Sequence, residues 1–286
     1  MNGIIIKGIG GFYYVKAADG CIYECKARGR FRKDGVTPII GDNVEIEING
    51  KKGSIARILE RRNALVRPAV ANIDTLVIIA AAASPEPNMC LLDKLTVAAL
   101  SNNIEPVICV NKTDLADGTA LAEIYKSAGL KTFMMSAENG DGVDALMPVL
   151  KDKITAFAGL SGVGKSTLLN RITGEDLKIG NVSEKIQRGR HTTRHVELFE
   201  LSDGGFVLDT PGFSSFELYG IKADELWEYF PEMADTAGKC RFRGCSHISE
   251  PDCAVKAKLE AGKISASRYD SYKELYNILK EIKDWE

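Results

Sequence analysis

A nine-residue stretch near the middle of the chain, Gly159-Leu160-Ser161-Gly162-Val163-Gly164-Lys165-Ser166-Thr167, most constrains what this sequence can fold into. It fits the pattern G-x-x-x-x-G-K-[ST], follows the apolar run of residues 154–159 and precedes a helical pattern over residues 167–172. A strand before the pattern and a helix after it are the context in which it forms a phosphate-binding loop. The glycines let backbone N–H groups turn toward a phosphate at the positive end of the helix. The stretch therefore predicts a nucleoside triphosphate site, with Lys165 reaching the β and γ phosphates and Ser166 coordinating Mg²⁺.

Strands and helices alternate in the residues that precede this loop. The continuous apolar run of residues 73–83 is typical of a strand buried on both faces of a parallel sheet. Further strands are predicted over residues 106–110 and 131–135, and helices over residues 91–99, 121–128 and 143–150. This alternation indicates an α/β domain.

Two short motifs after these strands indicate which base is bound. Asn111-Lys112-Thr113-Asp114 fits N-K-x-D, in which the Asp114 carboxylate accepts hydrogen bonds from guanine N1–H and its 2-amino group. We expect the stem of Lys112 to lie along the base and Asn111 to tie loops together. Ser136-Ala137 resembles the companion motif whose backbone reads the guanine O6. An ATP-using kinase, the competing interpretation, would leave Asp114 without a role.

The remaining nucleotide motifs follow the phosphate-binding loop. Asp209-Thr210-Pro211-Gly212 fits D-x-x-G, with Asp209 holding Mg²⁺ through water and the Gly212 N–H sensing the γ-phosphate. Residues 187–195 are polar and basic, and Thr192 or Thr193 is the candidate switch threonine that binds Mg²⁺ while the γ-phosphate is present.

The order of these motifs differs from that in Ras-like GTPases, where the phosphate-binding loop comes first. Here the N-K-x-D and Ser-Ala motifs precede it, which indicates a circular permutation. The D-x-x-G motif then joins directly to residues 214–286, so loss of the γ-phosphate can pull on the C-terminal region.

The first 62 residues are basic, although the whole chain of 286 residues has a net charge of −2. They hold twelve Lys or Arg and seven Asp or Glu, a net charge of +5, so the remainder carries −7. About five short strands separated by glycine-containing turns predict an OB-fold barrel, a common platform for single-stranded nucleic acid. A solvated basic face is the alternative. Four aromatic residues either stack on bases or fill the barrel core: Phe12, Tyr13, Tyr14 and Phe31.

Four residues near the C-terminus have the chemistry of a metal site: Cys240, Cys245, His247 and Cys253. Three thiolates and one imidazole close a tetrahedral zinc site with no open position, so the predicted zinc is structural. Lys239, Arg241 and Arg243 lie beside these ligands and are candidate contacts to RNA phosphates. The other four cysteines, Cys21, Cys25, Cys90 and Cys109, are predicted to be small core residues.

Together, the basic β-domain, the permuted motifs, Gly189-Arg190-His191-Thr192-Thr193-Arg194 and the Cys/His cluster resemble the RsgA (YjeQ) family over essentially the whole chain. The resemblance implies an OB-fold domain (residues 1–66), a permuted Ras-like α/β GTPase domain (67–218) and a mainly α zinc-binding domain (219–286). It also implies a GTPase that acts as a late-stage assembly checkpoint on the 30S ribosomal subunit and contacts 16S rRNA. Hydrolysis would be stimulated by the subunit and coupled to release.

The residue that positions the attacking water is the least defined. Phe213 occupies the position where Ras-type proteins place glutamine, and a phenyl ring cannot hydrogen-bond to water. The resemblance implies His191 as the substitute, whereas a histidine in this stretch could equally touch RNA. Phe213 therefore keeps a second hypothesis open, a guanine-nucleotide-gated RNA-binding switch whose turnover is incidental.

Composition excludes some classes of protein. No apolar run approaches the ~18–20 residues of a membrane helix. Seven cysteines, an odd number, argue against a secreted disulfide framework. We expect a cytoplasmic monomer that binds GTP and GDP, needs one structural Zn²⁺ and Mg²⁺ with GTP, and does not bind membranes.

Overall fold

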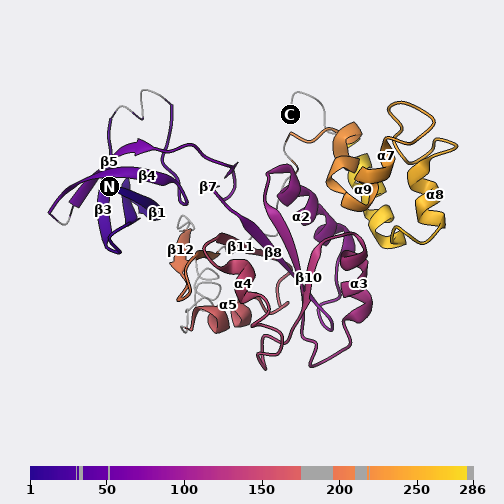
Figure 1. The fold of residues 1–286 in the computed structure, drawn as a ribbon, viewed down its shortest axis with the longest axis horizontal. Helices are drawn as coiled ribbons and strands as arrows, with labels where there is room; N and C mark the ends of the chain where they lie inside the picture. The colour runs from indigo at the N-terminus through magenta and orange to yellow at the C-terminus, as the bar shows by residue number, and fades with distance from the viewer. Residues whose placement is uncertain are drawn as a thin grey trace, which may run out of the picture. The chain divides into compact units, whose positions relative to one another are not determined.

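The computed structural model describes residues 1–29, 31, 35–50, 52–174, 196–209, 218 and 220–281. The chain divides into two compact units that interleave along the sequence. The first unit comprises Met1–Thr75, Met147–Phe157 and Leu169–Phe213, and the second comprises Leu76–Leu146, Ala158–Leu168 and Ser214–Glu286. Figure 1 labels the elements of each unit along the colour ramp from N- to C-terminus.

The first five strands close into a barrel in the first unit. They are β1 (Asn2–Ile9), β2 (Phe12–Ala17), β3 (Ile22–Ala27), β4 (Asn43–Asn49) and β5 (Lys52–Ile58). Their order is β1-β2-β3-β5-β4, and β1 also pairs with β4, which closes the barrel. The β3–β5 pair is parallel and the others are antiparallel. This architecture confirms the predicted N-terminal β-barrel.

Alternating side chains of these strands fill the barrel. The core contains Ile5, Val15, Cys25, Val44, Ile46 and Ile55, all essentially inaccessible to solvent. Phe31 belongs to the same core and Tyr13 packs against it. Of the two roles predicted for the aromatic residues, Phe31 and Tyr13 therefore fill the barrel core and do not stack on bases. Phe12 lies on the outside of this core, with the Lys26 ammonium 4.8 Å from its ring centre.

The prediction of four core thiols is only partly right. Cys25 and Cys109 are buried, Cys90 is half-buried and Cys21 is exposed. Cys21 precedes β3 in the turn after Asp19, whose carboxylate accepts its backbone N–H at 2.9 Å. A side chain in such a surface turn has no core to enter, so the prediction was wrong for Cys21.

A hydrogen-bonded linker leaves the barrel. It contains the short antiparallel pair β6 (Ala64–Leu65) and β7 (Val70–Ala71). The buried Asn72 has a φ of +59° and donates to Gly41 O at 2.9 Å, while its Oδ1 accepts the N–H of Arg62 at 2.9 Å. Asp74 then accepts the N–H of Ile154 at 2.9 Å. The linker is thus hydrogen-bonded to the barrel at one end and to the strand β11 (Ile154–Ala158) at the other.

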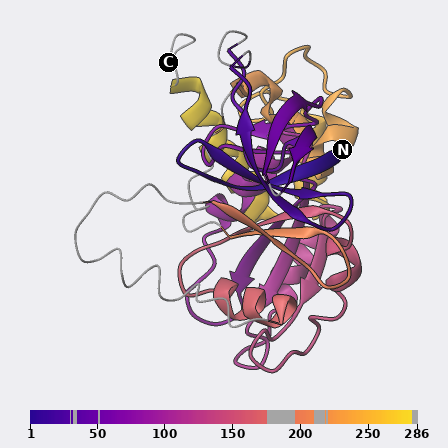
Figure 2. The same cartoon turned by 90° about the vertical axis from the view of Figure 1, so that its left-hand side faces the viewer.

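The first unit also contains a group of strands from the second half of the chain. Strand β13 (Phe206–Asp209) is parallel to β11 and antiparallel to β12 (Glu197–Glu200). Strand β12 in turn pairs with β1 at Lys7 and Glu197, and Figure 2 shows the orange β12 beside the indigo barrel strands. The Lys7 and Glu197 side chains form an ion pair of 2.6 Å. A barrel strand is therefore joined to the strand that follows the predicted switch segment.

The second unit contains parallel strands and the helices that flank them. Strands β8 (Thr75–Ala81), β9 (Glu105–Asn111) and β10 (Lys131–Met134) lie side by side in the order β10-β9-β8. Every residue of β8 is buried, as its continuous apolar run predicts. The connecting helices are α2 (Met89–Ser101) and α3 (Thr119–Ser127). Strands that alternate with helices confirm the predicted α/β region, and the helix α5 (Lys165–Thr173) follows β11 along the chain.

One predicted helix is shorter than expected. The pattern predicts a helix over residues 143–150, whereas α4 spans only Met147–Leu150. A helix that began at Val143 would place Pro148 in its interior, without an N–H to donate and with its ring against the carbonyl four residues earlier. Starting at Met147 places the proline in the first turn, where it is tolerated.

The C-terminal part of the second unit is mainly helical, as predicted. It comprises a 3-10 helix η1 (Ala223–Tyr229), α7 (Pro231–Ala237), α8 (Ala254–Glu260) and α9 (Ala266–Glu281). Helix α9 packs against α2 and η1. Among the helices that the structure describes, none is long and apolar enough to cross a membrane.

A buried ion-pair cluster joins α9 to α2 and α7. The Arg268 guanidinium donates to both carboxylate oxygens of Glu232, at 2.6 and 2.9 Å, and to Asp93 Oδ1 at 2.7 Å. Arg268 and Asp93 are inaccessible to solvent and Glu232 is buried. The rings of Phe230 and Tyr125 lie 4.8 and 5.5 Å from the guanidinium carbon. This cluster fixes the C-terminal helices on α2 through charge-assisted hydrogen bonds.

Candidate guanine-nucleotide site and metal centre

The predicted phosphate-binding loop begins where the buried strand β11 ends. Gly159 has a φ of +144°, and a Cβ there would lie 2.4 Å from Ile79 O. Gly162 and Gly164 have φ of +83° and +95°, and α5 begins at Lys165. Positive φ and close backbone approach are the two demands that only glycine meets easily. The loop has the curled backbone, followed by a helix N-terminus, that binds phosphate.

Lys165 is folded back over the loop. Its ammonium donates to Gly159 O at 2.7 Å and to Leu160 O at 2.8 Å. Burial of this half-buried side chain lowers its pKa below the ordinary lysine value. A phosphate anion beside the ammonium would favour the charged form instead, so the position suits an anionic ligand. Ser166 and Thr167, in the first turn of α5, are exposed and can reach a ligand or a metal ion.

Asn111 joins two of the predicted motifs to each other. Its side chain is buried, with Nδ2 donating to Val163 O at 2.8 Å and Oδ1 accepting the N–H of Ala137 at 2.8 Å. A Cβ at Gly164 would lie only 2.3 Å from Asn111 Nδ2. The structure thus brings the phosphate-binding loop, the N-K-x-D segment and the Ser-Ala segment together around one buried amide, although 52 residues separate Asn111 from Val163.

The other residues of the predicted base site lie next to Asn111 and Ala137 in the sequence. Thr113 N–H donates to Met135 O at 3.2 Å, which holds the segment against the end of β10, and the Asp114 carboxylate is exposed. Ser136 Oγ accepts the N–H of Asn139 at 3.2 Å, and Ser136 N–H donates to Asp141 O at 2.9 Å. The exposed Asp114 carboxylate can accept hydrogen bonds from a base, whereas both N–H groups of the Ser-Ala segment are donated within the protein, to Asp141 O and to Asn111 Oδ1.

One part of this site was missed by the sequence reasoning. The residues that follow β8 contact both motifs: Ala82 N–H donates to Asn111 O at 2.7 Å, and Lys112 Nζ donates to Ser84 O at 2.5 Å. A Cβ at Gly162 would lie 3.8 Å from Pro85 Cδ. Their position in the sequence could have indicated them, because ligands of open α/β sheets bind at the carboxyl ends of the strands and residues 82–85 follow the strand β8.

The predicted magnesium and switch residues are covered only in part. Ser166 lies on α5 and Asp209 is the last residue of β13. Thr192, Thr193, His191 and Gly212 lie outside the described residues. The assignment of Mg²⁺ to Ser166, Asp209 and the switch threonine, and the identity of the residue that positions water, therefore remain predictions.

The four predicted zinc ligands converge in the C-terminal region. The ligand atoms of Cys240, Cys245, His247 and Cys253 all lie within 4.8 Å of one another. Cys240 Sγ is 3.8 Å from Cys253 Sγ, and both are 3.5 Å from His247 Nδ1. With Zn–S of about 2.3 Å and Zn–N of about 2.0–2.1 Å, a tetrahedron has edges of about 3.8 Å between sulfurs and about 3.5 Å between sulfur and nitrogen. These separations and the Cys₃His donor set fit a structural zinc ion.

Surrounding contacts hold the ligand loop in shape. Tyr269 and Tyr272, both on α9, donate their hydroxyls to His247 O at 2.7 Å and to Ser246 O at 2.8 Å. His247 has a φ of +62°, a strained conformation for a residue with a side chain. Burial lowers its pKa, which favours the neutral imidazole that binds metals.

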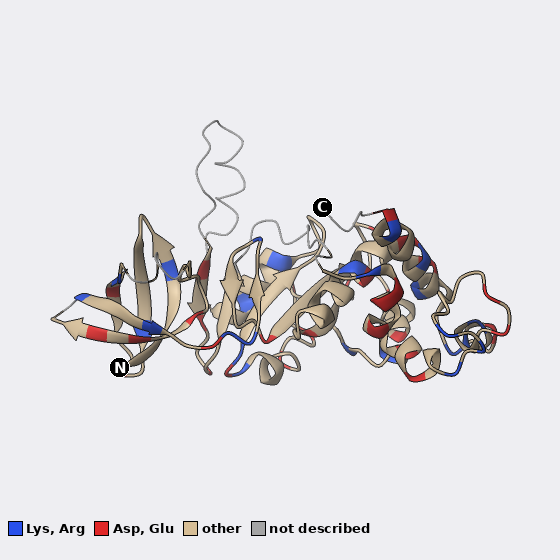
Figure 3. Cartoon of the chain, turned by 90° about the horizontal axis from the view of Figure 1, so that it is seen from above, with Lys and Arg blue, Asp and Glu red and all other residues tan. Residues whose placement is uncertain are grey.

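The positive charge of the barrel segment is largely neutralised where the structure describes it. Seven of its eight described cations form ion pairs: Lys7, Lys16, Arg28, Lys52, Arg57, Arg61 and Arg62. Figure 3 shows basic residues in blue and acidic residues in red together on the barrel strands. The segment's other four cations, Arg30, Arg32, Lys33 and Lys51, lie outside the described residues. Three of these four, Arg30, Arg32 and Lys33, lie within four positions of one another in the sequence.

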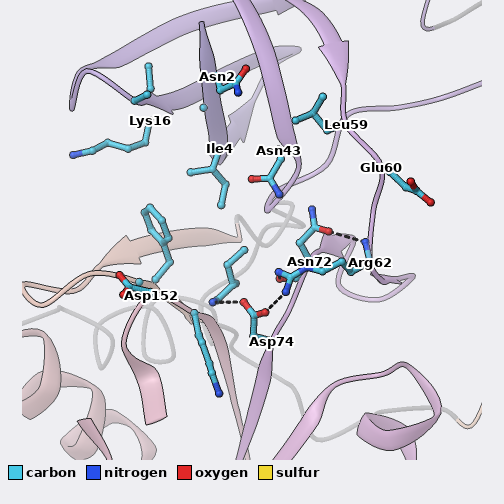
Figure 4. Close-up of a pocket in the computed structure, with 17 residues that line it drawn as sticks. Asn2, Ile4, Lys16, Asn43, Leu59, Glu60, Arg62, Asn72, Asp74 and Asp152 are labelled. Carbon is cyan, nitrogen blue, oxygen red and sulfur yellow. Dashed lines mark hydrogen bonds and ion pairs between the residues drawn. The ribbon is translucent and has the colours of Figure 1, made fainter. Parts of the chain in front are cut away.

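The first unit also contains a cavity of about 770 Å³. Residues of β1, the linker and β11 line it, and Arg62 lies there between Asn72 and Asp74 (Figure 4). None of its lining residues belongs to the predicted nucleotide or zinc sites. Two of its lining cations form ion pairs, Arg62 with Asp74 in the cavity wall and Lys16 with Glu200, which does not line the cavity.

Comparison with known proteins adds relatives that span the whole chain. Residues 58–219 match the RsgA GTPase family and residues 2–55 match the RsgA N-terminal domain. The chain is 51% identical to the small ribosomal subunit biogenesis GTPase RsgA of Ruminiclostridium cellulolyticum, covering 98% of this chain and 94% of the relative. It is 48% identical to the protein of the same name from Caldanaerobacter subterraneus, covering 100% and 97%.

Solved structures agree with these sequence relatives. The circularly permuted GTPase YloQ matches with a TM-score of 0.83 at 39% identity, covering 99% of this chain and 96% of that one. YjeQ from Thermotoga maritima matches with a TM-score of 0.85 at 35% identity, covering 99% of both. The permuted order inferred from the motifs is therefore the order of a known fold.

Proposed function

The chain belongs to the RsgA GTPase family, a family of GTP hydrolases, and from this membership we propose that it serves in the biogenesis of the small ribosomal subunit. It would act as a late-stage checkpoint on the 30S particle, contact 16S rRNA, and leave the particle when GTP is hydrolysed. One observation carries this proposal: similarity to relatives named for this role extends through the barrel, the nucleotide motifs and the Cys/His segment alike.

The proposed chemistry is in-line attack of water on the γ-phosphorus, which breaks the bond to the β–γ bridging oxygen and releases GDP and phosphate. Lys165 would meet the β and γ phosphates and so stabilise the charge that develops on them. Ser166, Thr193 and, through water, Asp209 would hold a Mg²⁺ ion, which would further neutralise the phosphate oxygens. We assign base recognition to the segments 111–114 and 136–137, and phosphate binding to residues 159–167 and Gly212.

His191 is the residue we propose for orienting the attacking water, because Phe213 stands where Ras-type proteins have glutamine. His191→Ala should bind GTP normally and turn it over slowly even with 30S subunits present. Normal turnover by this variant on the subunit would reject the role.

In this proposal the three domains, residues 1–66, 67–218 and 219–286, divide the work. The barrel and the basic residues beside the zinc ligands contact rRNA, and the central domain senses the nucleotide. One structural Zn²⁺ holds the C-terminal loop. The protein works as a cytoplasmic monomer, since the subunit itself is the partner.

The test is GTP turnover with and without purified 30S subunits. We expect stimulation of about tenfold or more, because a partner that completes a GTPase site commonly gives larger factors still. Purified 50S subunits are the matched control for nonspecific RNA, and Lys165→Met gives the background rate.

A guanine-nucleotide-gated RNA-binding switch is the second candidate, and Phe213 is the observation that favours it. Under that alternative, 30S subunits change turnover less than twofold, while the bound nucleotide changes affinity for the subunit. That result would overturn the hydrolysis-coupled proposal.

A further inference from the structure

We propose that the segment of residues 82–85, between β8 and α2, is a third recognition element of the nucleotide site, in which Pro85 positions Lys112 for its contact with guanine. The inference rests on the proposed assignment of residues 111–114 to the base. It goes beyond that assignment because neither Ser84 nor Pro85 belongs to a nucleotide motif.

Lys112 is held at both its backbone and its side chain. Its backbone is in the left-handed region, with a φ of +66°, although it is not glycine. Its ammonium donates to the carbonyl oxygen of Ser84 at 2.5 Å. The aliphatic stem therefore runs between a constrained backbone and a bonded ammonium, and the residue is half-buried.

The segment that carries this acceptor is hydrogen-bonded on both sides of Ser84. Ala82 N–H donates to Asn111 O at 2.7 Å, so the segment begins attached to the residue before Lys112. Farther along, Asn88 caps α2 by accepting the N–H of Leu91 at 2.9 Å. Between these anchors, Pro85 restricts the backbone of Ser84 to extended conformations, which sets the direction of its carbonyl.

Pro85 also faces the phosphate-binding loop. Its Cδ would lie 3.8 Å from a Cβ at Gly162, an ordinary packing distance from the turn of that loop. The segment thus contacts the N-K-x-D segment and faces the phosphate-binding loop, both of which are predicted nucleotide segments.

The physical consequence is preorganisation of a flexible side chain. A free lysine loses much rotamer entropy when its stem is ordered on a base. A stem already anchored by its ammonium has lost that entropy before the nucleotide arrives, so binding is tighter. Pro85 acts through Lys112 and has no contact with the reacting atoms, so it is a positioning residue.

The experiment is a double-variant cycle on the full-length protein, with the dissociation constant for GTP as the readout. Pro85→Ala should weaken GTP binding about five- to tenfold, the size expected for loosening one hydrogen bond to a charged group. In a Lys112→Met background, which keeps most of the stem but has no ammonium, the same Pro85→Ala change should alter affinity less than about twofold. Pro87→Ala, outside the segment, is the matched control and should stay within about twofold of wild type.

The other outcomes distinguish failure of this proposal from failure of the base-site assignment on which it rests. Equal effects of Pro85→Ala in both backgrounds, or none in either, would overturn the role of the segment. Wild-type GTP affinity in both Lys112→Met and Asp114→Asn would overturn the base-site assignment first. If Pro85→Ala melts at a lower temperature, Ser84→Gly frees the same carbonyl without removing the proline, and the same cycle is run with it.

Discussion

Gly164 shows how one residue can decide whether three segments meet. Its φ of +95° is strained for any other residue, and a Cβ would lie 2.3 Å from the amide nitrogen of Asn111. That amide joins the phosphate-binding loop to the Ser-Ala segment. The glycine is therefore required by a partner 53 positions earlier in the chain as well as by the local turn.

We predict that Gly164→Ala weakens GTP binding by an order of magnitude or more, because Asn111 must move to make room. Gly129→Ala is the matched control: its φ of +81° carries the same backbone strain, but nothing lies within 4 Å of its Cβ position. Nucleotide titration and thermal melting of both variants separate the two effects. Equal loss of GTP affinity in both would contradict the prediction.

Arg268 is the other residue whose role depends on distant partners. It is buried against two carboxylates, Asp93 and Glu232, so the cluster has one more acid than base. Burial raises the pKa of Asp93 despite the neighbouring guanidinium. We predict that Arg268→Met costs about 3–5 kcal/mol of unfolding free energy, because it leaves buried carboxylates without a partner. Asp93→Asn, which keeps the Arg268–Glu232 pair, should cost clearly less in urea unfolding at pH 7, and an equal cost would contradict this account.

The raised pKa of Asp93 also predicts how the unfolding free energy changes with pH. A folded-state pKa above the unfolded value means that the folded protein holds the Asp93 proton more tightly. Its contribution to stability is complete below the unfolded value and is lost as pH rises through the folded pKa. The unfolding free energy of the wild type should therefore fall relative to Asp93→Asn as pH increases from about 4. A difference that stays constant from pH 4 to pH 8 would show that Asp93 does not titrate in this way.

At the scale of elements, the Cys/His loop is the segment that depends most on a ligand. The described residues between α7 and α8 form turns and bends only, and two tyrosine hydroxyls from α9 support their carbonyls. Three cysteines and a histidine in this loop have few other reasons to converge. The metal should therefore supply most of the loop's order.

We predict about one zinc ion per chain, since one Cys₃His set closes one tetrahedral site. Removing the ion with a chelator, or changing Cys245 to Ser, should raise hydrogen exchange in residues 238–254 while exchange in β8 and β9 stays slow. Cys21→Ser is the matched control, because Cys21 is an exposed thiol outside the cluster. A metal-free protein with unchanged exchange in the loop would reject the ligand assignment.

Elements whose signal is local were predicted well. The barrel strands follow from alternating β-formers and glycine turns, and β8 follows from an unbroken apolar run. The helix α4 was overestimated because Pro148 limits where a helix can begin. The segment of residues 82–85 was missed because its importance lies in hydrogen bonds to Asn111 and Lys112, which no pattern within the segment records.

At the scale of the whole molecule, the net charge of +5 on residues 1–62 overstates how many of their described cations are free to bind an anion. Seven of the eight described cations of residues 1–62 form ion pairs with acidic residues. Two of these pairs, Lys7–Glu197 and Lys16–Glu200, join the barrel to β12. Cations engaged in this way have less charge to offer a nucleic acid. The sequence cluster of Arg30, Arg32 and Lys33 is therefore the candidate RNA contact that we test.

We predict that replacing Arg30, Arg32 and Lys33 together by alanine weakens binding to 30S subunits and lowers the salt slope of that binding by about 2–3. Replacing Lys126, Lys131 and Lys273, which form surface ion pairs elsewhere, removes the same charge as a control and should leave the slope unchanged. Filter binding between 50 and 200 mM salt measures both. Equal slopes for the two triple variants would place the RNA contact outside this stretch.

By itself, the sequence determined the phosphate-binding loop, the guanine motif, the permuted order, the Cys/His donor set and the alternation that produces the barrel and the α/β region. These follow from local backbone chemistry, repeating apolar patterns and donor types, all of which are written in short stretches of residues. Only the tertiary structure decided that Phe31 fills the barrel, that Ser84 anchors Lys112 and that Arg268 joins two carboxylates far away in the chain. Those outcomes depend on which distant groups meet when the core excludes water, and a buried charge or a free lysine takes its role from the partner it finds there.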